Sequence, residues 1–287
     1  MKRVVLAFAI FLPALLSALP AAAEIRLKGT ARFGLNYRNG AVTQEYRTRI
    51  DFHLKGRTEG GLAFGAFTRV SIDGQATGIF SGAAVWIEKD KVRLTLGNTS
   101  GAIAARAAIW GCSVGYRGAS CADLVTNLQP AGWQPTMTTS SSTGAGPNLI
   151  RLDLPLGRKT KMSISGGNGN DLEIALRRSG KPWSIGFGYD FGSGTNGGAT
   201  LIIDWKKGEW AWGLDIGRYG NFTNVVANIA WKYRKGEELY AYASMLGGAH
   251  SVGISWKKKL GGGAMLKAGI ESAAGNIMAD IGIKFRF

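Results

Sequence analysis

The stretch NIMADIGIKFRF, residues 276–287, alternates apolar and polar side chains with a period of two. One face carries Ile277, Ala279, Ile281, Ile283, Phe285 and Phe287, and the other carries Asp280, Lys284 and Arg286. Successive side chains of a β-strand point to opposite faces of its sheet, so this pattern predicts a strand with one apolar and one polar face.

The same period of two runs back through the chain to Glu24, with one long interruption. It predicts an all-β fold of about 16 antiparallel strands, each close to the ~10 residues that a tilted membrane-crossing strand needs. A count of 14 is the alternative, and an even number is expected in either case. The predicted strands are 24–37, 46–54, 62–70, 78–88, 91–97, 147–154, 160–167, 171–178, 183–192, 198–206, 209–218, 222–234, 238–246, 250–258, 263–271 and 276–287.

The connections between these strands alternate in character. Those after even-numbered strands are short and rich in Lys and Arg, such as PLGRK and KKGE, and we interpret them as periplasmic turns. Those after odd-numbered strands, such as RNGAVTQ and GSGTNGG, are slightly longer, Gly-rich and nearly uncharged, so we expect them at the outer end.

The apolar face decides between a soluble sandwich and a membrane barrel. One small interior cannot hold the apolar residues of about 16 strands, whereas a barrel of that size turns them to lipid and keeps a polar lumen. Aromatic residues share the parity of the apolar positions near strand ends, as in an interfacial girdle. They are Tyr37, Trp183, Trp205, Trp210, Trp212, Trp231, Tyr233, Trp256, Phe285 and Phe287.

The first 23 residues have the features of a cleaved signal peptide: Lys2 and Arg3, an apolar run, and Ala21–Ala23 before Glu24. The apolar run is too short for a transmembrane helix. Removing Lys2 and Arg3 leaves 33 basic and 19 acidic residues, a formal charge of +14. Export makes nucleic acid an unsuitable partner for this charge, and we expect none.

Four stretches carry a resemblance to a known family: the C-terminal strand, EIRLKGTARFGLNY (24–37), RTRIDFHLKGRTEGGLAFGA (47–66) and VRLTLGN (92–98). Together they resemble the alphaproteobacterial general porins of the Gram-negative outer membrane. The resemblance implies a 16-stranded barrel, residues 24–287, that sits in outer-membrane lipid and assembles as a homotrimer. It also implies that the C-terminal strand, with Ile283, Phe285 and Phe287, is read by the barrel insertion machinery.

In that family the long loop after the fifth strand folds into the barrel and narrows the pore. Residues 98–147 are the corresponding segment here, and we expect them to form a constriction loop. In the family, carboxylates of this loop commonly face arginines on the barrel wall and set a field across the pore. The loop here contains one acid, Asp123, beside Arg106 and Arg117, so most of these carboxylates are missing. It also holds Cys112 and Cys121, the two cysteines of the chain, which should form a disulfide in an oxidising compartment.

Basic residues at polar-parity positions on the first, second, third and fifth strands should project into the lumen. The predicted pore-lining residues are Arg26, Lys28, Arg32, Arg47, Arg49, Asp51, Arg69, Arg93, Arg106, Arg117 and Asp123. Their net positive charge favours the passage of small anionic solutes through a passive diffusion channel. The alternative is a plugged structural or adhesin-type barrel.

The residue pattern contains no arrangement typical of a catalytic site or a metal site. His53 and His250 have no catalytic spacing to Ser or Asp, so we expect no enzyme, and a small hydrolytic barrel is the remaining enzymatic alternative. No Cys or His cluster has metal-ligand spacing, and neither a metal nor a cofactor is expected.

Overall fold

The structure is a computed structural model that describes residues 24–74, 76–109, 114–117, 139–167, 170–192, 197–273 and 275–287. The predicted signal peptide, both cysteines and Asp123 lie outside these residues. Across the described ranges, no helix has the length and apolar character needed to span a membrane.

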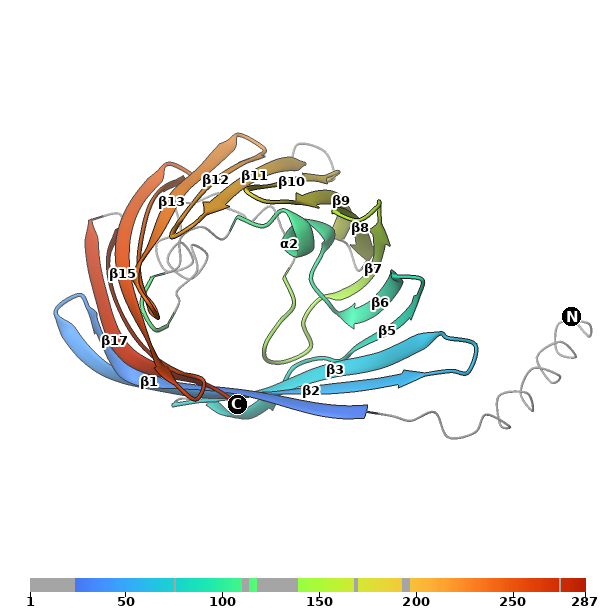
Figure 1. Ribbon diagram of the computed structural model, residues 1–287, viewed down its shortest axis with the longest axis horizontal. Helices are drawn as coiled ribbons and strands as arrows, with labels where there is room; N and C mark the ends of the chain where they lie inside the picture. Colours follow the sequence, from blue (N-terminus) through green and yellow to red (C-terminus); the bar gives the residue numbers. More distant parts are fainter. Residues whose placement is uncertain are drawn as a thin grey trace, which may run out of the picture.

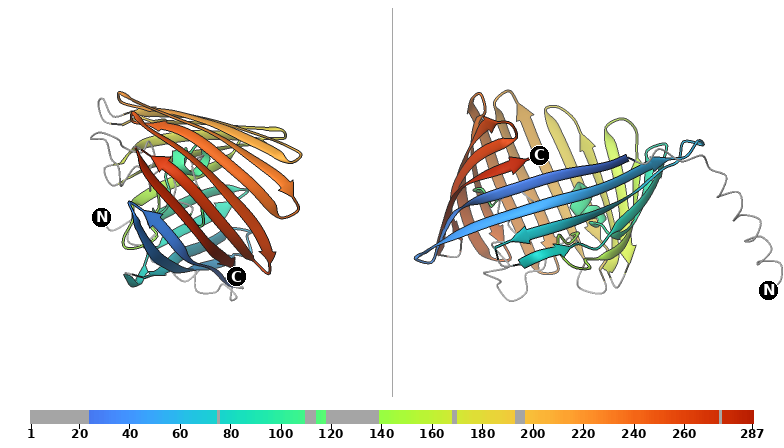
Figure 2. Two further views of the ribbon diagram at one scale, coloured as in Figure 1. Left: turned by 90° about the vertical axis from the view of Figure 1, so that its left-hand side faces the viewer. Right: turned by 90° about the horizontal axis from the view of Figure 1, so that it is seen from below.

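The strands form one antiparallel sheet that closes on itself, because β1 pairs with both β2 and β17 (Figures 1 and 2). Their bounds are β1 Glu24–Arg38, β2 Ala41–Arg57, β3 Ala63–Asp73, β4 Ala76–Phe80, β5 Ala84–Lys89, β6 Val92–Asn98, β7 Asn148–Pro155, β8 Thr160–Gly167, β9 Asn170–Ser179, β10 Trp183–Asp190, β11 Gly198–Lys207, β12 Trp210–Tyr219, β13 Phe222–Arg234, β14 Glu237–Leu246, β15 Ala249–Gly261, β16 Ala264–Ala273 and β17 Asn276–Arg286. A short helix, α2, spans Ala102–Arg106 and lies inside the ring of strands in Figure 1. The predicted transmembrane barrel fold is confirmed.

The barrel has 16 strand positions, because β4 and β5 are two halves of the fourth strand. Both halves pair with β3, and residues 81–83 separate them. Gly144 fills the gap: its N–H donates to the Phe80 carbonyl at 2.9 Å and its carbonyl accepts from the Gly82 N–H at 2.5 Å. The backbone hydrogen bonds between β4 and β5 are therefore supplied by Gly144, a residue far away in the sequence. The alternation of apolar and polar residues in 78–88 predicts one unbroken strand and did not reveal this break.

The C-terminal strand closes the barrel against β1. Phe33 lies opposite Ile283 in the register, and its ring stacks on Phe285 with centroids 5.9 Å apart. The Gly29 N–H donates to the Phe287 carbonyl at 2.6 Å, and the Phe287 N–H donates back to Gly29 at 3.1 Å. The aromatic chain end is thus held in the closing seam, where no unpaired strand edge remains.

The turns correct one expectation, since the segment RNGAVTQ is mostly strand. Asn39 and Gly40 alone connect β1 to β2, and both have positive φ values, 51° and 82°. Two successive positive φ angles are typical of the two-residue hairpin turn whose twist matches the strands it joins. The first outer connection is therefore a tight turn, and the prediction of longer connections was wrong at this position.

The apolar faces of the strands point outward. Ile25, Leu27 and Phe33 on β1 are 69%, 59% and 52% exposed. In the described part of the chain, the clusters of buried apolar residues lie instead where the long loop meets the inner wall. Such exposure would be costly in water and is favourable in lipid, which is the arrangement of a membrane barrel.

A charge placed on the outer face should therefore destabilise the barrel. Ile281 lies at the middle of β17 and is half exposed. We expect Ile281→Arg to lower the free energy of unfolding by roughly 2–4 kcal/mol, measured by denaturant titration in bilayers. Asn228→Arg, on the inner face of β13, is the matched control and should cost much less. An equal loss of unfolding free energy in the two variants would contradict the placement of Ile281 on the outer face.

Candidate functional site: the inner wall of the barrel

Basic side chains from four adjacent strands form one surface on the inner wall. The register aligns Lys284 with Arg32 and then with Arg47 in one row. It aligns Arg286 with Thr30 and then with Arg49 in the next row. We call this surface the basic wall; it consists of Lys28, Arg32, Arg47, Arg49, Arg69, Lys284 and Arg286.

Two members of the basic wall, Lys284 and Arg286, were not among the residues predicted to line the pore. Their polar parity on the last strand was visible in the sequence, but their neighbours were not. Closure of β17 onto β1 places Lys284 directly opposite Arg32, which itself lies opposite Arg47. Like charges in direct cross-strand positions are destabilising, so this concentration of charge is costly to the fold.

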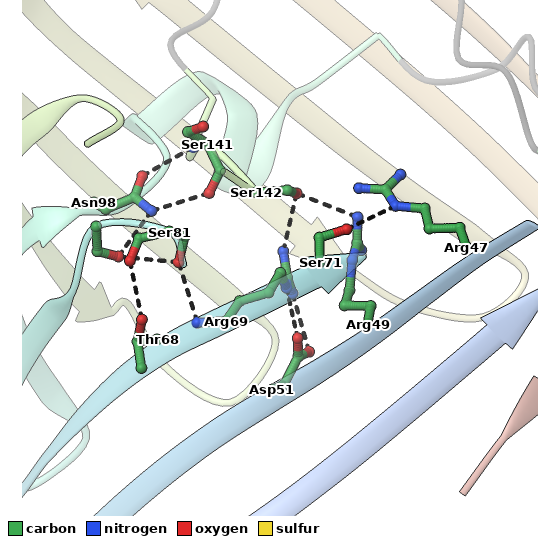
Figure 3. A network of polar contacts seen from close by, with 11 residues as sticks. Arg47, Arg49, Asp51, Thr68, Arg69, Ser71, Ser81, Asn98, Ser141 and Ser142 are labelled. Carbon is green, nitrogen blue, oxygen red and sulfur yellow. Dashed lines mark hydrogen bonds and ion pairs between the residues drawn. The ribbon is translucent and has the colours of Figure 1, made fainter. Parts of the chain in front are cut away.

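Arg69 is held by a carboxylate and by the return arm of the long loop, residues 139–147 (Figure 3). Its Nε and Nη2 donate to Asp51 at 2.5 and 3.0 Å, which is a bidentate ion pair. Its Nη1 donates to the Ser142 hydroxyl at 3.3 Å. Asn98 fixes the arm, because its amide exchanges hydrogen bonds with the backbone of Ser141 at 2.9 and 3.0 Å.

Arg47 and Arg49 differ from Arg69 because serines, not carboxylates, hold them. Arg47 Nε donates to Ser71 at 3.0 Å, and Arg49 Nη2 donates to Ser142 at 3.2 Å (Figure 3). Asp73 lies opposite Arg47 in the register, whereas the ion pairs of Arg32 and Arg69 are made with Glu45 and Asp51. The neutral hydroxyls that hold Arg47 and Arg49 do not reduce the charge of either guanidinium group.

Several other predicted pore residues are paired with acids. Arg26 pairs with Glu24 at 2.8 Å at the start of β1. Arg93 pairs with Glu88 at 2.7 Å, and its guanidinium lies 4.1 Å from the centre of the Trp86 ring. These two arginines lie on the inner face but have direct counter-charges.

The arginines of the long loop also have acidic partners on the wall. Arg106 donates to Asp153 at 2.9 Å and to Ser163 at 2.8 Å, so it points at β7 and β8. Arg117 pairs with Glu45, which also accepts from Arg32. Asp51 and Asp123 are the two acids predicted to line the pore, and the structure adds Glu45 and Asp153.

The first arm of the long loop lies flat against the inner wall. Helix α2 packs on β8, β9 and β10, where the buried Ile103 and Ala107 meet Ala175 and Ile202. The N–H of Ile103 donates to the Glu173 carboxylate at 3.0 Å. Further along, Ile109 and Val114 join a second buried cluster with Val226, Tyr242 and Leu246.

A row of inward-facing glycines makes this close approach possible, and we call it the glycine track. A methyl group added at Gly217 would lie 2.6 Å from Ile109, and one at Gly269 would lie 2.5 Å from the backbone nitrogen of Gly115. Both distances are shorter than real contacts allow. The track consists of Gly186, Gly188, Gly217, Gly253, Gly269, Gly282 and Gly34, on six strands.

The far end of the first arm is anchored by a carboxylate of the last strand. Asp280 accepts the backbone N–H of Tyr116 at 3.1 Å and that of Arg117 at 3.2 Å. The ring of Tyr116 covers the track glycines of β17 and β1. Burial, together with Glu45 and Asp280, raises the pKa of the Tyr116 phenol to about 12, so it stays neutral at physiological pH.

Comparison with known proteins agrees with this architecture. The chain matches the family described as Gram-negative porin over residues 6–259. Substituted variants of the porin of Rhodopseudomonas blastica superpose with TM-scores of 0.78 and 0.77 at 20% and 21% identity, covering 92% of this chain and 100% of theirs. No curated protein sequence matches the chain significantly.

A closed 16-position barrel with an apolar exterior, a charged inner wall and a loop folded inside is an outer-membrane channel. The chain belongs to the Gram-negative porin family. Its location is therefore the outer membrane.

Proposed function

We propose that this porin is a passive diffusion channel that prefers small anionic solutes. The observation that carries the proposal is the pair Arg47 and Arg49, whose guanidinium groups are held by the neutral hydroxyls of Ser71 and Ser142. Lys284 extends the same positive surface across the closing seam. No catalytic function is proposed, since the family and the fold are those of channels.

The basic wall should act on a passing ion as one surface. Charges in a narrow aqueous pore act over a Debye length, ~10 Å at 0.1 M salt, so an ion feels several of them together. A unit charge at 4 Å contributes about 1 kcal/mol even at the dielectric constant of water. Glu45 and Asp51 are engaged with Arg32, Arg69 and Arg117, and the basic residues of the wall outnumber the acids, so the positive potential should prevail.

Screening gives the proposal a direct test. The ratio of anion to cation permeability should fall as KCl rises from about 0.1 M to about 1 M, because the Debye length shrinks to ~3 Å. Permeability ratios from planar bilayers at both concentrations measure this. An anion preference that does not change with salt would mean that pore shape, not the charge of the basic wall, is responsible.

Two other functions would give different results. A plugged structural or adhesin-type barrel would show no stepwise conductance in a planar bilayer, whereas a diffusion channel should conduct in steps. A hydrolytic barrel would cleave lipid or protein as purified material. The tight turns at Asn39–Gly40 and at Gly247–Gly248 disfavour an adhesin, because recognition usually requires long loops.

The assembly of the protein follows from its family as a proposal. We infer that residues 1–23 are removed on export, that Ile283, Phe285 and Phe287 form the signal for the insertion machinery, and that the channel forms a homotrimer. Residues 98–147 would then act as the constriction loop of each protomer.

The two cysteines give a further prediction about this loop. Cys112 and Cys121 should form a disulfide, and a ring this short stabilises the protein by about 2–3 kcal/mol in the loop-entropy model. A thiol label should not modify the unreduced, denatured protein, and should modify two thiols after reduction. Stoichiometric labelling without reductant would refute the bridge.

A further inference from the structure

The outer face of β11–β15 carries a continuous group of large aromatic side chains at one end of the barrel. Trp205 stacks on Trp212 with ring centroids 6.3 Å apart, and Trp210 stacks on Trp231 at 5.3 Å with an interplanar angle of 5°. Tyr233 lies 5.6 Å from Trp231. We call this group the tryptophan belt; it consists of Trp205, Trp210, Trp212, Trp231, Tyr233 and Trp256.

The polar atoms of Trp256 and Tyr233 form hydrogen bonds that lead to Glu237, at the end of the barrel that carries the basic residues. The Trp256 indole N–H donates to the Tyr233 hydroxyl at 2.8 Å, and that hydroxyl donates to Glu237 at 2.6 Å. Glu237 in turn lies 3.4 Å from the Lys258 ammonium. Indole and phenol groups with one apolar side and one polar tip lie at the membrane–water boundary, so this end of the belt marks the headgroup level.

Basic residues follow the belt directly, at the ends of β11, β13 and β15 and in the turn between β13 and β14. All are exposed, and in the part of the chain that the structure describes none has a carboxylate within ion-pair distance. They are Lys206, Lys207, Lys232, Arg234, Lys235 and Lys259. The nearby acids are few: Glu237 is taken by Lys258 and Glu238 by Lys257, which leaves Glu209.

The charge is confined to one end of these strands. At the opposite end, the turns at Gly220–Asn221 and Gly247–Gly248 carry no charged residue, and Arg218 is the nearest basic one. A basic patch that served only solubility would have no reason to sit beside the interfacial aromatic residues. We place the basic end at the periplasm, because the long loop after β6 begins at the other end.

We propose that the tryptophan belt and its basic turns bind the headgroup phosphates of anionic phospholipids in the inner leaflet of the outer membrane. The aromatic rings set the depth of the barrel, and the cations at this rim, with Lys207 on the outer face and Lys235 in the turn, select anionic over zwitterionic headgroups. Each basic residue near an anionic membrane surface strengthens attraction by ~1 kcal/mol, or roughly fivefold. The proposed lipid-binding surface lies outside the lumen, so lipid binding is independent of the ion selectivity of the channel.

The test measures which lipids remain on the purified protein. The full barrel is reconstituted in vesicles of equal phosphatidylglycerol and phosphatidylcholine, extracted in mild detergent, and its retained lipids are quantified by mass spectrometry. We expect phosphatidylglycerol to be enriched several-fold on the unmodified protein. The variant Lys207→Gln, Lys235→Gln, Lys259→Gln should lose most of that enrichment.

A matched control carries three substitutions at the same barrel end but away from the belt, at the ends of β2 and β5 and in the β7–β8 turn: Arg57→Gln, Lys89→Gln and Arg158→Gln. It should keep the enrichment. Equal retention of the two lipids by the unmodified protein would overturn the proposal, as would equal losses in both variants. Binding to isolated peptidoglycan that depends on the same lysines, without lipid enrichment, would also overturn it. Heat-modifiable gel mobility confirms that each variant is a folded barrel.

Discussion

Replacing Arg47 and Arg49 together by glutamate should move the selectivity of the channel strongly toward cations. Both side chains point into the lumen from β2, and the change removes two positive charges and adds two negative ones in adjacent rows of the basic wall. The wall's formal charge falls by four units, and each unit contributes on the order of 1 kcal/mol even at the dielectric of water. The permeability ratio in planar bilayers measures the shift.

The control for this variant applies the same charge change outside the lumen. Arg158→Glu with Lys159→Glu lies in the β7–β8 turn and should leave selectivity close to that of the unmodified channel. Should the turn variant shift selectivity as far as the wall variant, total charge would be the cause and the assignment to Arg47 and Arg49 would be wrong.

The second large effect is expected from the glycine track. Gly269→Leu places a side chain where the backbone of Gly115 lies, 2.5 Å from the position of the added Cβ atom. Overpacking of this kind costs roughly 1–3 kcal/mol, and the first arm of the long loop must leave the wall to relieve it. The loop can move only toward the lumen, so we expect a lower single-channel conductance together with lower stability.

Gly166→Leu is the matched control, because this glycine faces outward on β8 and an added Cβ would approach only Leu172, at 4.0 Å. It should leave conductance unchanged. Unchanged conductance in Gly269→Leu would show that the wall under the loop does not set the width of the pore.

The fold could be predicted largely from the period of two, because lipid on one side and water on the other impose that period on every strand. The NIMADIGIKFRF strand illustrates this: its parity alone placed Ile281 outside and Lys284 inside. Parity does not say which strands are neighbours across the closing seam. The alignment of Lys284 with the row of Arg32 and Arg47 therefore appeared only in the closed barrel.

The pairing of the pore arginines could not be read from local sequence. Arg106 and Asp153 are far apart in the chain, and the loop path that joins them depends on glycines of distant strands. The division of the fourth strand has the same origin, since Gly144 supplies its missing hydrogen bonds. Local patterns encode which face a side chain occupies, whereas tertiary packing determines which charges remain uncompensated.

The central claim is that Arg47 and Arg49, held by serines on the inner wall, make the channel prefer anions. The zero-current potential of the unmodified protein, across an about tenfold KCl gradient at low ionic strength, tests it most directly because screening is then weakest. We predict a potential of the sign that chloride permeation produces. A potential of the opposite sign, set by potassium, would contradict the account.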